Sequence, residues 1–131
     1  MHAPGFAKYP DHEVKTRPLD AEIEIYFEND AIAYTNTSIL LTETDCRPVL
    51  YIPKIDLKDV DLIKSGEYDC PFKGKAEIYN LKHGTTVLDN AAWSYEEPYE
   101  EFQDLKGHVA FYPNQYLKIK MEGNDDLGLI H

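Results

Sequence analysis

The stretch of this sequence best suited to chemistry is Cys70-Pro71-Phe72-Lys73-Gly74, which brings a thiol, an aromatic ring and an ammonium group into five positions. A thiolate at Cys70 could act as a nucleophile or a redox group, and Lys73 could stabilise its negative charge. Against this, the adjacent Asp69 would disfavour a thiolate, and free cysteines are among the most buried residues. The stretch therefore predicts either a reactive thiol or a small buried residue at a tight turn.

Acid/base chemistry has a second candidate in Glu43, which ends an apolar stretch. Glu43 could be the buried partner of Lys73 or an exposed strand end, and if buried it is the best general acid or base in the chain. Lys73 and Gly74 could bind a carboxylate or phosphate, because glycine allows close approach of the backbone. A cysteine nucleophile would also need an organised base, for which His83 and His108 are the candidates.

Aromatic side chains could form a pocket wall around these groups, although core packing explains them almost as well. The chain has ten tyrosines against five phenylalanines, and this excess of hydroxyl groups slightly favours a pocket. The candidates for catalysis are thus Cys70 and Glu43. The candidates for ligand binding are Lys73, Gly74, Trp93, Tyr95, Tyr51 and Tyr112.

The elements that must position these residues are mostly strands. Apolar and polar residues alternate from residue 22, as is typical of a half-buried strand, and Asn29-Asp30 predicts a hairpin turn. Helical spacing predicts a short helix over 56–64, stopped by Ser65-Gly66, and a second over 98–106. Further strands are predicted over 31–35, 38–43, 49–52, 75–82, 86–88, 91–95, 108–112 and 116–121.

About eight short strands with two short helices predict an all-β or β-rich fold, a small single-domain curled β-barrel or sandwich. Prolines punctuate the first residues without any periodicity, so we expect an N-terminal arm over 1–20. The β-rich domain is expected over 21–122 and a C-terminal tail over 123–131.

Composition restricts the partners. The 131 residues carry a formal net charge of −11, which disfavours nucleic acids and anionic membranes. No apolar run approaches the roughly 20 residues that cross a bilayer, and no signal peptide is evident, so a cytoplasmic protein is expected. The two cysteines, Cys46 and Cys70, are too few for a four-thiolate zinc site, and no metal or other cofactor is predicted. The oligomeric state stays open.

A series of landmarks from residue 22 to about 114 resembles the DUF427 family of small proteins of unassigned function. The landmarks are Ala33, Glu43, Tyr51-Ile52-Pro53, Asp56, Cys70-Pro71-Phe72-Lys73-Gly74, Ala76, Ala91-Ala92-Trp93-Ser94-Tyr95, Pro98, Gly107 and Ala110-Phe111-Tyr112. The resemblance implies one compact β-rich domain with a pocket formed by motif residues. The chain departs from it at Tyr34-Thr35-Asn36-Thr37, where relatives often carry an arginine, and at Asp69, where they tend to have threonine.

The family is sometimes labelled nucleotidyltransferase-like, a reaction that usually needs paired carboxylates to hold a divalent metal. Asp59 and Asp61 follow no Gly-Ser element and lie on the expected wet face of a helix, so this activity is not predicted. The sequence predicts instead a pocket for a small polar or anionic ligand, with thiol or acid/base chemistry possible. The alternative is a protein-interaction or structural module without catalysis, in which the same residues are core and turns.

Overall fold

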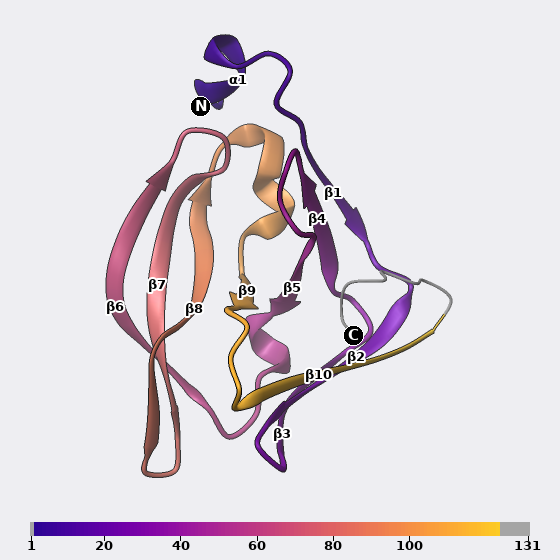
Figure 1. Cartoon of the computed structure of the whole chain (residues 1–131), viewed down its shortest axis with the longest axis vertical. Helices are drawn as coiled ribbons and strands as arrows, with labels where there is room; N and C mark the ends of the chain where they lie inside the picture. The colour runs from indigo at the N-terminus through magenta and orange to yellow at the C-terminus, as the bar shows by residue number, and fades with distance from the viewer. Residues whose placement is uncertain (1, 124–131) are drawn as a thin grey trace.

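The computed structural model describes residues 2–123, which form two antiparallel sheets and three short helical segments (Figure 1). The larger sheet has, in spatial order, β1 (Val14–Pro18), β4 (Ile39–Glu43), β5 (Val49–Pro53), β9 (His108–Phe111), β8 (Thr86–Pro98), β7 (Gly74–His83) and β6 (Asp61–Cys70). The smaller sheet has β10 (Leu117–Gly123), β2 (Ala21–Phe27) and β3 (Asp30–Thr35). The helical segments are α1 (Gly5–Lys8), η1 (Lys54–Asp56) and η2 (Glu100–Leu105).

The predicted β-rich fold is confirmed as a sandwich, and a closed barrel is wrong. The outermost strands of the larger sheet, β1 and β6, do not pair with each other, so this sheet keeps both of its edges within residues 2–123. β6 is exposed along most of its length, which suits an edge strand that pairs only with β7.

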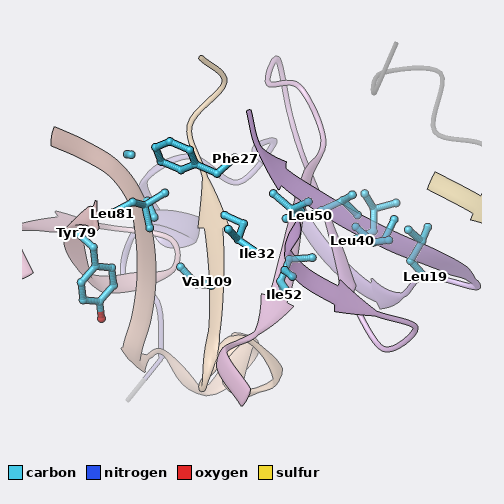
Figure 2. Close-up of a cluster of buried hydrophobic side chains, with 14 of the residues drawn as sticks. Leu19, Phe27, Ile32, Leu40, Leu50, Ile52, Tyr79, Leu81 and Val109 are labelled. Carbon is cyan, nitrogen blue, oxygen red and sulfur yellow. The ribbon is translucent and has the colours of Figure 1, made fainter. Parts of the chain in front are cut away.

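Neighbouring residues on the central strands belong to different cores, because successive side chains of a strand point to opposite faces. Leu40 and Ile52 pack in a first core between the two sheets, where Figure 2 shows them near Leu50 and Ile32. The residues next to them, Leu41 and Tyr51, pack in a second core with Cys70, Tyr95, Ala110, and Phe102 and Leu105 of η2. The larger sheet is therefore covered on both faces.

The alternation in β2 is confirmed, since Ile23, Ile25 and Phe27 are buried while Glu22 is exposed and Glu24 is only partly buried. The predicted hairpin follows, with Phe27 paired to Asp30. In β10, Leu117, Ile119 and Met121 pack against the first core, and the lysines between them are exposed.

The helix predicted over 56–64 is wrong. Only Lys54–Asp56 is helical, and β6 begins at Asp61. A nine-residue helix has little stability of its own, whereas pairing with β7 satisfies the backbone along ten residues. Gly66 does not stop a helix but follows a shift of register, a usual place for glycine in a strand. The second predicted helix is present in shorter form as η2.

The first residues wrap over the domain rather than projecting from it. We call residues 2–13 the docked arm. The Gly5 amide donates to the Pro71 carbonyl at 2.9 Å, and β1 then pairs with the edge of β4. Of the predicted tail over 123–131, Gly123 ends β10 and the other residues lie outside the described part of the chain. No helix among residues 2–123 is long and apolar enough to cross a membrane.

Candidate functional site

Cys70 to Gly74 forms the hairpin turn between β6 and β7. Cys70 pairs with Gly74, and the three residues between them make the loop. Gly74 has φ +121°, and a Cβ there would lie 2.7 Å from the Glu97 carbonyl oxygen, so glycine is required. Cys70 is only 7% exposed, which fits the buried turn residue better than the reactive thiol.

The turn places Lys73 against Glu43. Lys73 Nζ donates to Oε1 of Glu43, and Nε2 of His12 lies 2.8 Å from Oε2 of the same carboxylate. The side chains of Glu43 and Lys73 are 12% and 11% exposed. Of the two alternatives for Glu43, the structure thus shows the buried partner of Lys73. We call His12, Glu43 and Lys73 the Glu43 cluster.

Electrostatics keep Glu43 charged. Burial alone would raise the pKa of its carboxyl group, but the hydrogen bonds from Lys73 and His12 outweigh burial and hold the pKa below its ordinary value. An ionised carboxylate only accepts hydrogen bonds, so Nε2 of His12 must carry the proton that it donates. Nδ1 of a neutral His12 is then an acceptor, and no protein group within residues 2–123 hydrogen-bonds to it.

The His12 ring is held by the turn and the docked arm together. It stacks on Phe72 with ring centroids 4.0 Å apart and an interplanar angle of 28°. Phe6 of the arm packs edge-on against Phe72, with ring centroids 5.1 Å apart. Beside the ring lies a hollow of about 510 Å³. Its lining residues are Lys8, Tyr9, Pro10, Asp11, His12, Thr44 and Phe72.

Strand pairing explains why the arm delivers His12 to this place. Val14 of β1 pairs with Glu43, and the ladder continues where the Thr44 amide donates to the Glu13 carbonyl at 2.9 Å. The Glu13 amide in turn donates to the Thr44 hydroxyl at 2.8 Å. These bonds fix His12, the residue before Glu13, beside the end of β4.

Sequence reasoning missed His12, which lies 31 positions from Glu43 in a stretch without periodicity. The histidines it considered have other partners. His83 contacts the Asp59 carbonyl at 2.7 Å and Asp30 at 2.9 Å, and His108 contacts the Lys106 carbonyl at 3.0 Å. The one available signal was local: His12 lies two residues before the start of β1, a strand that pairs with the edge of β4.

The predicted aromatic wall lies in the second core. Trp93 Nε1 donates to the Tyr51 hydroxyl at 3.0 Å, and Tyr51 and Tyr95 are 1% and 4% exposed. Burial raises the pKa of both tyrosines, so their hydroxyl groups stay neutral. Cys70 belongs to the same core, whereas Tyr112 is 40% exposed and stacks outside it, its ring 4.3 Å from that of Trp93.

A second polar network, also missed, lies around Tyr79 of the first core. The Tyr79 hydroxyl is 3.0 Å from Lys54 Nζ, 2.8 Å from Ser94 Oγ and 2.7 Å from Glu77. Lys54 also pairs with Glu96. Burial opposes both charges, yet their mutual hydrogen bond holds the pKa of Lys54 above and that of Glu96 below the ordinary value. These groups satisfy one another and tie η1 to β7 and β8.

The described residues form no group suited to binding a metal ion. Asp59 and Asp61 are exposed, and within residues 2–123 no three side chains of His, Cys, Asp or Glu are grouped so that they could hold a metal ion.

Comparison with known families gives one match. Residues 15–124 match the family described as a domain of unknown function, DUF427. A search of curated proteins finds no match. The matched range contains Glu43, Lys73 and the landmarks around them, but it begins after His12.

Proposed function

Because the chain belongs to the DUF427 family, whose function is unknown, we propose from the chemistry of the site that it binds a small polar or anionic ligand in the hollow beside the Glu43 cluster. The single observation that carries this proposal is the His12 ring. It lines the hollow, its Nε2 is fixed by an ionised carboxylate, and its Nδ1 is left without a protein partner in the described chain.

The hollow supplies further groups suited to such a ligand. The Lys8 ammonium can donate hydrogen bonds, and Phe72 offers an apolar face. The Thr44 hydroxyl already donates to the Glu13 carbonyl, so it contributes polar surface rather than a free donor. Such groups matter because the net charge of −11 repels anions in general, so that an anion needs local positive or polar groups.

The arrangement also suits proton transfer. His12 would take a proton from the ligand at Nδ1 and become an imidazolium, which the Glu43 carboxylate stabilises. Lys73 keeps Glu43 from taking that proton itself, because its ammonium group favours the ionised carboxylate. In this scheme His12 is the catalytic residue, while Glu43 and Lys73 are positioning residues. Cys70, packed beneath them, takes no part in the reaction.

Nuclear magnetic resonance of the His12 ring tests the proposal. Sodium phosphate and sodium acetate are titrated at constant ionic strength while the ring signals are followed. We expect a saturable shift, because an anion binds together with a proton, which converts His12 into an imidazolium whose Nδ1–H donates to the anion. Glu43→Gln should weaken binding about tenfold, since a hydrogen bond to a charged group contributes about 1.5–3 kcal/mol.

The matched control is His108→Asn, which removes a histidine that contacts only a backbone carbonyl of its own turn. His12→Asn should abolish the saturable effect on the neighbouring Thr44 amide, whereas His108→Asn should leave it unchanged. Shifts that grow linearly with anion concentration, or that survive His12→Asn, would refute the proposed site.

The tight packing of Tyr51, Cys70 and Tyr95 favours the alternative of an interaction module, since residues exposed by only 1–7% form no open pocket of their own. On that reading the landmarks stabilise the hairpin and the second core. The anion titration separates the two functions, because an interaction module has no reason to bind phosphate or acetate at His12.

A further inference from the structure

A second cleft opens where β5 and β9 separate. These strands share only two pairs, Ile52 with Val109 and Pro53 with His108. Continuing this register would pair Leu50 with Phe111, but Leu50 pairs only with Leu40 of β4, and Phe111 only with Ala92 of β8. The larger sheet is therefore split at this point, and the chain leaves β9 to cross over to β10 (Figure 1).

The split leads to the first core. The resulting cleft has a volume of about 550 Å³, within the range of small-molecule sites. Val49, Leu50 and Phe111 line it from the separated strands, and Ile25, Leu117 and Ile119 line it from the smaller sheet. Ile25 and Leu50 are core residues, whereas the other four are only partly buried. Apolar side chains in such a cleft gain from being covered by an apolar ligand.

One charged residue, Arg47, is among the residues that line this cleft. It lies in the connection between β4 and β5 and makes no hydrogen bond or ion pair with residues 2–123. An arginine binds a carboxylate through two parallel hydrogen bonds, and in an acidic protein a cation with no partner among the described residues favours an anionic group. The cleft thus offers an apolar surface with one site for negative charge at its rim.

We propose that this cleft binds a small amphipathic carboxylate, an acyl or aryl acid whose apolar part lies between the sheets and whose carboxylate pairs with Arg47. The site is independent of the Glu43 cluster, because the two share no lining residue. The chain can accordingly hold two ligands of different character at once.

Displacement of a fluorescent probe tests this inference. The intact protein is saturated with 1-anilinonaphthalene-8-sulfonate, which is apolar and carries one negative charge, and is titrated with octanoate and with octanamide. We expect octanoate to displace the probe about tenfold more effectively than its neutral amide, since a charge-assisted hydrogen bond is worth about 1.5–3 kcal/mol. Arg47→Gln should remove this preference.

Lys118→Gln is the matched control, because it removes the same charge from the exposed face of β10 next to the cleft. Ile119→Phe should block both ligands by filling the cleft, because Ile119 lines it and packs against the first core, and Leu117→Phe repeats the test if Ile119→Phe does not fold. His12→Asn should leave octanoate binding unchanged, so a failure of the Glu43 site does not affect this result.

Three outcomes would overturn the inference. Equal binding of octanoate and octanamide, or an unchanged preference in Arg47→Gln, would exclude the carboxylate. Binding that appears only after deletion of residues 124–131 would identify that segment as the occupant. A dimer in sedimentation equilibrium that Ile119→Phe dissociates and octanoate does not would identify a second copy.

Discussion

At the scale of single residues, the two carboxylate oxygens of Glu43 contact different partners, and each contact has a different effect. Oε1 accepts from Lys73, which keeps the carboxylate ionised, and Oε2 holds His12 in one orientation. The two interactions are coupled, because a buried carboxyl group without Lys73 would favour its protonated form, which accepts a weaker hydrogen bond from Nε2. The cluster therefore behaves as one unit rather than as three separate groups.

Glu43→Gln should make the free energy of unfolding depend less on pH in the acidic range. The pKa of Glu43 is lowered on folding, so its ionised form stabilises the folded state above the ordinary value of 4.5, and this contribution is lost as pH falls through the folded value. We expect a loss of about 1–3 kcal/mol at pH 7, much smaller at pH 3, because the lost bonds involve charged groups. Urea unfolding at both pH values measures it.

Glu122→Gln is the control for this prediction, because Glu122 is exposed at the end of β10. A free-energy difference that is the same at pH 3 and pH 7 would show that Glu43 is not ionised in the folded protein.

The two cysteines should differ widely in reactivity. Cys46 is exposed and Cys70 is buried, so an aromatic disulfide reagent should modify Cys46 at once and Cys70 only when the second core opens. In Cys46→Ser protein we expect modification at least about a hundredfold slower than in Cys70→Ser protein, in line with protection by a folded core. Comparable modification rates in the two variants would show that Cys70 is a reactive thiol in the folded protein.

At the scale of elements, the docked arm and η2 hold each other. The Ala3 amide donates to both carboxylate oxygens of Glu101, at 3.2 and 3.1 Å, and Phe6 packs with Phe102. Glu101 of η2 therefore has a partner on the arm. The arm lies so close to the turn at Gly5 that a Cβ there would lie 2.7 Å from the Phe72 ring.

Gly5→Ala should undock the arm. Its methyl group would also come within 2.9 Å of the Pro71 carbonyl, so the arm or the turn has to move, at a cost of about 1–3 kcal/mol for overpacking. We expect faster amide exchange over residues 2–13, faster modification of Cys70 and loss of the anion-dependent shift at His12.

Gly66→Ala serves as the matched substitution, because the nearest atom to its Cβ is Ile78 Cβ at 3.9 Å. Exchange and modification rates should stay near those of the unchanged protein. If Gly5→Ala behaved like Gly66→Ala, the arm would not be held by the contact with Phe72.

At the scale of the whole molecule, one sheet supports two cores. β4, β5 and β9 each supply residues to both, so neither core can be lost while these strands stay in place. The smaller sheet covers one face, and η2 with the docked arm covers the other. The two candidate binding sites lie at different places on this frame, one beside the arm and one at the split between β5 and β9.

Ile52→Ala and Leu105→Ala should weaken the same unfolding transition, although they lie in different cores. Each removes a fully buried side chain, which costs about 2–5 kcal/mol. Near-ultraviolet circular dichroism follows Trp93 and far-ultraviolet circular dichroism follows the strands during urea unfolding. The two curves should coincide in both variants; an earlier loss of the Trp93 signal in Leu105→Ala would show that η2 unfolds alone.

Strict alternation made much of this frame predictable. Ile23, Ile25 and Phe27 face one core, and a one-residue shift would have placed Glu22 and Glu24 inside. The β6 strand was not predictable in the same way, because an edge strand with few buried residues carries no alternation, and chance spacing of Leu57 and Val60 resembled a helix.

The candidate site was predictable only where its residues lie in strands and turns. Glu43 and Lys73 could be suggested as partners, because an acid that ends an apolar strand and a lysine in a tight turn each need a counter-charge if buried. His12 could not be, since its position depends on the pairing of β1 with β4 and on the stack with Phe72, and both are contacts distant in sequence.

His12 lies before residues 15–124, the range that matches the family, so membership in the family does not imply a histidine at this place. The group proposed to face a ligand, His12, and the groups that hold it, Glu43 and Lys73, are encoded in separable segments. A relative can conserve every core position and the Glu43–Lys73 pair and still recognise something else, if a dozen residues before its first strand differ. Shared membership in this family is therefore a guide to architecture, and the short leading segment is the place to compare when asking whether two members do the same work.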